Sequence, residues 1–180
     1  LEPDFTLYYK AIMAPFAPHI QKAVAKVIDL PIKIIGPSHG PILRDHPKDY
    51  ILRYKVMSEP VVVSPYVVVA YASAYGYTKA LANSIINELS PHIEVKVFNL
   101  ENDERSEIVA SINNAKAVLF GSPTFNQDAI EPVWFLMASL SAIINRGKTA
   151  AAFGSYGWSG EAVELMSQRL KGLKFDVLPG

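Results

Sequence analysis

A short segment rich in hydroxyl groups separates an apolar run from a helical pattern, and it has the features of a phosphate-binding loop. The apolar run covers residues 66–71 and predicts a buried strand, and residues 78–89 have the spacing of a helix. A helix N-terminus offers free backbone N–H groups and the positive end of the helix dipole, which both favour an anion. The residues that could hold the anion are Ser73, Ala74, Tyr75, Gly76, Tyr77 and Thr78.

The same segment has an alternative interpretation as an ordinary strand-to-helix turn, with Thr78 as the N-cap residue of the helix. As a phosphate site, it is neither a G-x-G-x-x-G loop nor a loop followed by G-K-[ST]. It therefore fits one terminal phosphate, as in flavin mononucleotide (FMN), and we expect FMN rather than FAD.

Two later segments could complete a site for a flat heteroaromatic ring. The first follows an apolar run at residues 117–121, and its backbone amides could bond the polar edge of such a ring; it contains Pro123, Thr124, Phe125 and Asn126. The second follows the run at residues 149–154, and its aromatic rings could stack on the ligand while glycine lets the backbone approach; it contains Ser155, Tyr156, Gly157, Trp158, Ser159 and Gly160. The alternatives are a plain loop for the first, and for the second an aromatic pair that packs against neighbouring helices.

The order of the elements predicts an α/β fold with a doubly wound parallel sheet. Strands are expected over residues 66–71, 94–99, 117–121, 149–154 and 174–178, and helices over residues 78–89, 106–113, 131–144 and 160–171. Strands that alternate with helices of this length imply a parallel sheet with helices on both faces. Ligands bind such sheets beyond the carboxyl ends of the strands, so the three segments should meet there.

The first 60 residues have a different pattern and are expected to form a separate domain remnant and linker, with residues 61–180 as the second domain. Helices are expected over residues 15–29 and 49–56, a short strand over 32–35, and a linker over 57–65. His39 lies in the turn-rich segment after the short strand and is a candidate metal ligand. A single histidine is more often structural, so the residues alone leave both roles open.

Composition limits the class of protein. The 180 residues carry 17 basic and 17 acidic side chains, which argues against nucleic acid or an anionic membrane as a partner. No apolar run is long enough to cross a membrane, and the absence of cysteine excludes disulfides and thiolate metal sites and is compatible with a cytoplasmic location. The chain begins at Leu1 and stops just after an expected strand, so we expect a fragment whose last elements are missing.

Together these segments resemble the flavodiiron proteins, or A-type flavoproteins. That family joins a metallo-β-lactamase-like diiron domain to a flavodoxin-like FMN domain. Residues 9–19 resemble the late part of the diiron domain, and Gly36-Pro37-Ser38-His39-Gly40-Pro41 resembles the segment with its final histidine ligand. Residues 72–78, 121–126 and 153–160 resemble the three FMN loops.

The resemblance implies a flavodoxin-like sheet preceded by the C-terminal remnant of an αββα metallo-β-lactamase-like domain, with His39 as an iron ligand. It implies FMN, a non-haem diiron centre in the full-length protein, and reduction of O2 to water and/or NO to N2O. A rubredoxin-like protein or a reductase would supply electrons to a homodimer or homotetramer. The family's His-x-Glu-x-Asp-His cluster is absent, so this chain alone should lack diiron activity. A stand-alone flavodoxin-like electron carrier is the alternative, and a scaffold without cofactor is a third possibility.

Overall fold

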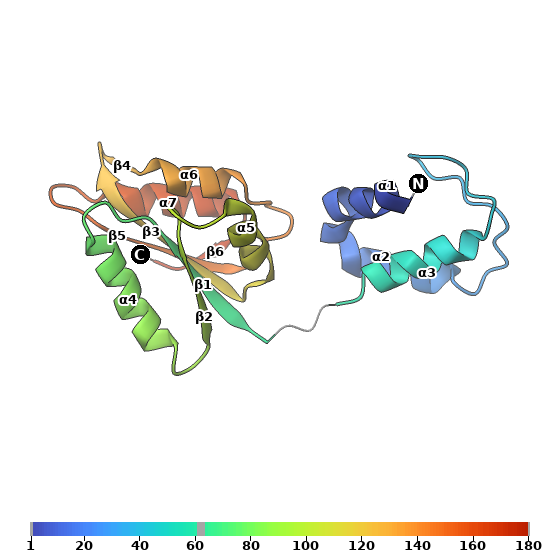
Figure 1. Ribbon diagram of the computed structural model, residues 1–180, viewed down its shortest axis with the longest axis horizontal. Helices are drawn as coiled ribbons and strands as arrows, with labels where there is room; N and C mark the ends of the chain where they lie inside the picture. The colour runs from blue at the N-terminus through green and yellow to red at the C-terminus, as the bar shows by residue number, and fades with distance from the viewer. Residues whose placement is uncertain (1, 61–63, 180) are drawn as a thin grey trace. The chain divides into compact units, whose positions relative to one another are not determined.

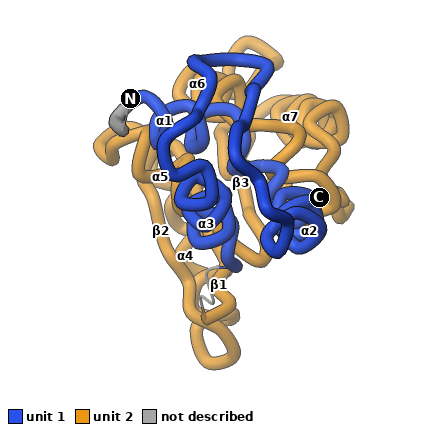
Figure 2. Tube along the Cα trace, turned by 90° about the vertical axis from the view of Figure 1, so that its right-hand side faces the viewer, with its two compact units in different colours: residues 1–62 blue, residues 63–180 orange. Residues whose placement is uncertain are grey.

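The computed structural model describes residues 2–60 and 64–179, which form two compact units, residues 1–62 and 63–180 (Figures 1 and 2). Each unit has a hydrophobic core of its own. None of the described helices is both long and apolar enough to cross a membrane. The predicted linker includes residues 61–63, which lie outside the described residues.

The second unit contains a parallel sheet of the predicted doubly wound type. Its parallel strands are β1 (Tyr66–Tyr71), β2 (Glu94–Asn99), β3 (Ala117–Phe125), β5 (Thr149–Ser155) and β6 (Asp176–Val177). They lie in the order β2-β1-β3-β5-β6, so the chain reverses its direction of travel across the sheet between β1 and β3. This order is the flavodoxin-like one, and it confirms the predicted fold class.

Helices cover both faces of the sheet, as Figure 1 shows. The helices are α4 (Tyr77–Leu89), α5 (Arg105–Asn114), α6 (Glu131–Ala138) and α7 (Glu161–Gly172). The main core places side chains of α5, α6 and α7 against one face, including Ile112, Met137 and Met166, all fully buried. Helix α4 packs on the other face through Ala82, beside Val69 and Tyr71 of β1. Strand β1 is buried on both sides, which explains why its sequence is apolar throughout.

The register of the strands brings the three candidate loops to one edge. Tyr71 of β1 pairs with Gly121 of β3, and Gly121 pairs with Phe153 of β5. These residues therefore form one row across the sheet. Because the strands are parallel, the segments that follow them all leave at the carboxyl edge.

The third strand differs from the prediction, because residues 121–126 are not a plain loop. Strand β3 continues to Phe125 and pairs with the antiparallel β4 (Asp128–Ala129). Asn126 and Gln127 join the two strands with φ angles of 49° and 62°. Positive φ at both central residues is the type I′ hairpin geometry, which matches the twist of paired strands. The Asn-Gln pair is a weaker hairpin signal than Asn-Gly, which is why the prediction missed it.

The helix expected over residues 131–144 was predicted too long. Helix α6 ends at Ala138, and the backbone N–H groups of Ile143 and Ile144 bond the hydroxyl of Ser141. A serine hydroxyl that bonds nearby backbone N–H groups gives the chain an alternative to the helix. The helix therefore ends although the apolar pattern of the sequence continues.

The first unit is mainly helical. Its elements are α1 (Glu2–Tyr8), a π-helical turn η1 (Tyr9–Met13), a 3₁₀ turn η2 (Ala14–Phe16), α2 (Ala17–Val27) and α3 (Pro47–Met57). The strand predicted at residues 32–35 is wrong, because only an isolated bridge between Ile35 and Leu43 forms there. A single bridge is too short to count as a strand, because no further residue pairs extend the ladder. Among the described residues of this unit, the buried hydrophobic side chains are Tyr9, Ile20, Val24 and Ile51.

Candidate functional site

A cavity of about 780 Å³ lies at the carboxyl edge of the sheet in the second unit. It is next to the point between β1 and β3 where the strand order reverses, which is where ligands bind in open α/β sheets. The predicted residues that line it are Tyr75, Tyr77, Pro123, Thr124, Phe125, Ser155, Tyr156 and Gly157. All three predicted loops thus contribute to one cavity.

The loop between β1 and α4 ends in a glycine whose backbone conformation only glycine adopts comfortably. Gly76 is the N-cap residue of α4 and has φ of +86°. A side chain in this left-handed conformation would be strained. The hydroxyl of Ser73 accepts the backbone N–H of Lys79 at 3.1 Å. The alternative with Thr78 as N-cap is wrong, because Thr78 lies inside the first turn of α4.

The side chain of Thr78 links the first and third loops. It is 1% exposed, and its hydroxyl oxygen lies 2.8 Å from that of Ser155 at the end of β5, in a hydrogen bond. Ser155 pairs with Pro123 in the neighbouring strand, so it is held by the sheet. The buried hydroxyl of Thr78 therefore has a fixed partner on a separate element.

The second loop is bonded to the rest of the site through backbone and hydroxyl groups. The Ser122 hydroxyl donates to the carbonyl of Pro123 at 2.8 Å and accepts the N–H of Ile130 at 3.0 Å. Strand β5 passes so close that a Cβ on Gly154 would collide with the carbonyl oxygen of Ser122. A glycine is thus required there for the second and third loops to approach each other.

Aromatic side chains form much of the cavity wall. Tyr75 and Phe125 stack on each other, with ring centroids 6.0 Å apart and planes 26° apart. Tyr156 also lines the cavity, and its side chain is 66% exposed. Trp158 is 98% exposed and does not line the cavity. Neither ring packs on a helix as a core residue would, which argues against the alternative interpretation of the third loop.

Eight of the predicted residues do not line the cavity. These are Ser73, Ala74, Gly76, Thr78, Asn126, Trp158, Ser159 and Gly160. The sequence reasoning also missed four residues that line the cavity: Ala80, Leu81, Ser84 and Gly154. Three of these lie on α4 at helical spacing from Tyr77, so the face of the helix that follows the loop was the available signal.

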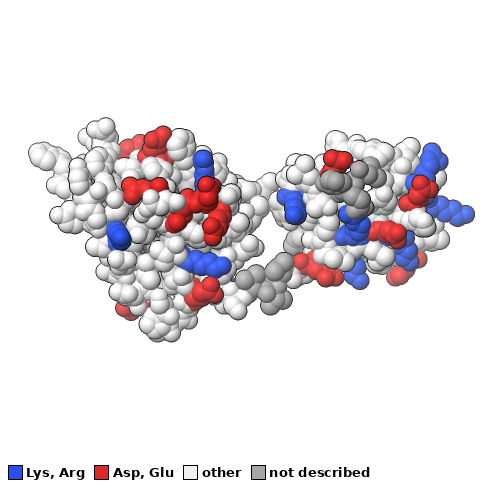
Figure 3. All heavy atoms as spheres, viewed as in Figure 1, with Lys and Arg blue, Asp and Glu red and all other residues white. Residues whose placement is uncertain are grey.

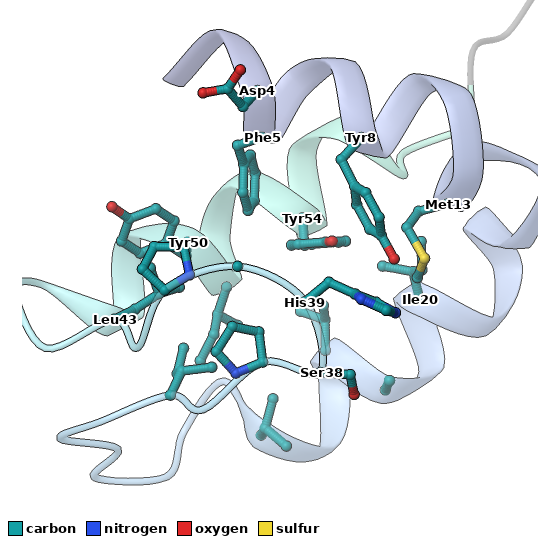
Figure 4. A pocket seen from close by; sticks show the side chains of 18 residues that line it. Asp4, Phe5, Tyr8, Met13, Ile20, Ser38, His39, Leu43, Tyr50 and Tyr54 are labelled. Atoms are coloured by element: carbon teal, nitrogen blue, oxygen red, sulfur yellow. The ribbon is translucent and has the colours of Figure 1, made fainter. Parts of the chain in front are cut away.

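His39 is in the first unit, in the wall of a separate hollow of about 840 Å³ that is mostly apolar (Figure 4). Its imidazole lies near the ring of Tyr8, with centroids 6.1 Å apart. Among residues 2–60 and 64–179, no three His, Cys, Asp or Glu side chains come together in a way that could hold a metal ion. The described residues therefore do not fit a diiron centre by themselves.

Comparison with known proteins decides the family. Residues 69–179 match the family model described as flavodoxin. The chain belongs to the flavodoxin family. The match begins within β1 and runs through β6, so it covers every strand of the sheet and all three loops of the cavity.

The flavodoxin match is part of a longer similarity that includes the first unit. The chain is 40% identical to the Type A flavoprotein of Rhodobacter capsulatus over 178 residues, which is 95% of this chain and 41% of the relative. It is 36% identical to a flavo-diiron protein of Clostridium acetobutylicum, covering 98% of this chain and 46% of the relative. It is 35% identical to the nitric oxide reductase of Moorella thermoacetica, covering 95% and 43%.

A solved structure agrees with these relatives. Rubredoxin oxygen:oxidoreductase from the anaerobe Desulfovibrio gigas superposes with a TM-score of 0.70 at 29% identity, covering 96% of this chain and 44% of that one. The resemblance to flavodiiron proteins is thus confirmed. The chain spans less than half the length of the relatives that it matches.

FMN is the cofactor of the flavodoxin fold, which confirms the predicted cofactor, and the cavity has the chemistry to hold it. Its lining contains hydroxyl and aromatic side chains and no Lys, Arg, His, Asp or Glu. Hydroxyl groups and the α4 N-terminus can hold a phosphate without a cation, because helix N–H groups and the helix dipole supply the donors. The aromatic walls suit a flat ring.

On the surface, Figure 3 shows acidic and basic side chains mixed on one face of each unit.

Proposed function

We propose that this chain is the FMN-dependent electron-transfer part of a flavodiiron oxidoreductase that reduces O2 to water and/or NO to N2O. One observation carries the proposal: the similarity to relatives named as flavodiiron protein and nitric oxide reductase covers both units, whereas the flavodoxin family matches only the second. A stand-alone flavodoxin-like carrier would need no counterpart of the first unit.

In this proposal the chain's own residues bind and orient the flavin. Bound FMN supplies one- and two-electron redox chemistry. The phosphate lies at the N-terminus of α4, where the hydroxyl of Thr78 is bonded to that of Ser155, which lines the cavity. Tyr75, Phe125 and Tyr156 flank the ring and keep water from its faces. The second loop contributes backbone N–H groups toward the polar edge of the ring.

The remaining parts of the proposal concern the whole protein. Residues 1–60 are a remnant of a metallo-β-lactamase-like diiron domain with its linker, and residues 61–180 are the FMN domain. His39 is one iron ligand among others supplied by further chain. A rubredoxin-like protein or a reductase donates electrons, the assembly is a homodimer or homotetramer, and the location is the cytoplasm. Support comes from the relatives, one of which is named a rubredoxin oxygen:oxidoreductase.

Flavin identification tests the proposal at the level of this chain. Flavin released from the purified chain by denaturation should run as FMN on chromatography. A peak at the position of FAD, or a chain that takes up no FMN, would contradict it. At the level of the full-length protein, removal of FMN should abolish reduction of O2 and NO by an external donor while leaving bound iron in place. Reduction that persists without flavin would contradict the relay role.

A further inference from the structure

The hydrogen bond between Thr78 and Ser155 has a consequence for anion recognition, and it rests on the proposed FMN function. We propose that Ser155 is a positioning residue that sets the hydroxyl of Thr78 for the phosphate of FMN. Thr78 lies in the first turn of α4 and Ser155 at the end of β5, and their hydroxyl oxygens are 2.8 Å apart.

Other hydroxyl groups of the same helix show what is special about Thr78. The hydroxyls of Ser84 and Ser90 donate to the carbonyl oxygens four residues earlier, those of Ala80 and Ile86, at 3.1 and 2.6 Å. Thr78 is the second residue of α4, so the residue four positions earlier precedes the helix. Within the described residues, the hydrogen bond of the Thr78 hydroxyl is the one to Ser155.

Counting hydrogens shows why this bond favours an anion. Each hydroxyl has one hydrogen to donate and two lone pairs that accept. One hydrogen serves the bond between the two oxygens, and the other is free for a third group. The oxygens of a phosphate dianion only accept, and the N–H groups at the start of α4 would face such an anion bound at this helix end. When Ser155 donates to Thr78, the Thr78 hydrogen is free to join those N–H groups.

Ser155 can fix this arrangement because it lies on a rigid element. It is paired with Pro123 across the sheet, next to the glycine that brings β5 close to β3. A threonine in a helix divides between two side-chain rotamers, and at Thr78 no helical carbonyl lies four residues earlier to favour one of them. The bond to Ser155 selects one rotamer before the flavin binds. Thr78 then has less side-chain freedom to lose on binding, which strengthens the contact with the phosphate.

Titrations with FMN and riboflavin test this role, because riboflavin has the same ring without the phosphate. Ser155→Ala should lower FMN affinity about three- to tenfold, the range of one ordinary hydrogen bond, and should lower riboflavin affinity by clearly less. Ser155→Thr, which keeps the hydroxyl, should restore FMN affinity. Thr78→Val should cost more than Ser155→Ala, because it removes the direct, charge-assisted bond. Adding Ser155→Ala to Thr78→Val should cost nothing further, since Ser155 acts through Thr78.

Ser90→Ala is the matched control, because it removes a hydroxyl from the far end of the same helix and should not change FMN affinity. If Ser155→Ala changes FMN and riboflavin affinity equally, changes neither, or adds to the effect of Thr78→Val, the positioning role is overturned while FMN binding stands. If the native chain does not bind FMN, the proposed function and this role both fail. Thermal melting checks folding, and Ser155→Cys, a weak donor of similar size, replaces Ser155→Ala if that variant does not fold.

Discussion

Tyr75 and Phe125 lie almost parallel, with ring centroids 6.0 Å apart, although one follows β1 and the other ends β3. Both are partly exposed, at 79% and 42%, so the pair is not part of a hydrophobic core. Two stacking contacts on a flat ring need about 7–8 Å between the outer rings. Because their centroids are 6.0 Å apart, the two rings would have to separate for a flavin ring to enter between them.

Replacing Phe125 with Ala should weaken FMN binding roughly three- to tenfold, because one aromatic contact is worth about 0.5–1.5 kcal/mol beyond its buried area. Flavin fluorescence in the complex should rise, since stacking quenches it. Fluorescence titration measures both. Phe135→Ala is the control, as Phe135 is an exposed aromatic of α6 outside the cavity. Equal effects of the two substitutions would show that Phe125 does not contact the flavin.

A second prediction separates the two aromatics of the third loop. Tyr156→Ala should weaken FMN binding and raise flavin fluorescence more than Trp158→Ala, because Tyr156 lines the cavity and Trp158 is 98% exposed. The measurement is the same titration on both variants. A larger effect at Trp158 would mean that the third loop rearranges when the flavin binds, and two silent variants would exclude this loop as a stacking surface.

Gly76→Ala should destabilise the second unit by roughly 1–2 kcal/mol and reduce FMN affinity, because φ of +86° is strained for any residue with a side chain. Gly172→Ala is the control, since both sites have open space around a Cβ and only Gly76 has positive φ. That change, at the end of α7, should be neutral or stabilising. Urea unfolding and FMN titration give the two readouts, and equal unfolding free energies for both variants would contradict the strain at Gly76.

The burial of Lys148 leads us to expect an unusual pH dependence of the free energy of unfolding. Its ammonium donates to the carbonyl of Ile112 and to Asn145 Oδ1, and burial lowers the pKa of Lys148 from 10.5 to about 8. Between these values the unfolded chain holds the proton and the folded chain has released it. The free energy of unfolding should therefore rise as pH rises from about 8 toward 10.5.

Urea unfolding of the native chain and of Lys148→Met between about pH 8 and 9.5 checks the Lys148 prediction. The native chain should gain stability with pH relative to the variant, because only it carries the titrating amine. Burial raises the pKa of Tyr66 and of Tyr71, but both proteins carry these phenols, so their effect cancels in the comparison. Parallel pH profiles of the two proteins would exclude Lys148 as the titrating group.

The final prediction concerns iron. One imidazole cannot hold a diiron centre, so this chain alone should contain no stoichiometric iron. In the full-length protein, His39→Ala should lower iron content and leave flavin content nearly unchanged, because His39 and the flavin cavity belong to different units. His19→Ala, an exposed histidine of the same unit, is the control. Metal analysis and flavin quantification check this prediction. Unchanged iron content in His39→Ala would mean that His39 is not an iron ligand, and a lower flavin content would show that the two sites are coupled.

The strands and the edge of the sheet that holds the site were predictable from the sequence. Strand β1 is buried on both faces, so its apolar run is continuous and can be recognised without a structure. Alternating strands and helices make the sheet parallel, and parallel strands bring their following loops to one edge. The glycine and hydroxyl content of residues 73–78 then indicates an anion at a helix N-terminus, whatever the packing around it.

Tertiary structure alone decided which side chains meet inside that site. The stacking of Tyr75 on Phe125 depends on a type I′ turn that extends β3, and the bond between Thr78 and Ser155 depends on the register of β5 against β3. It also placed Tyr156 in the cavity wall and left Trp158 outside it. Such contacts join residues far apart in the chain, and a shift of one residue in strand register would turn each side chain to the other face. Local patterns determine the elements, whereas the register between them determines the contacts.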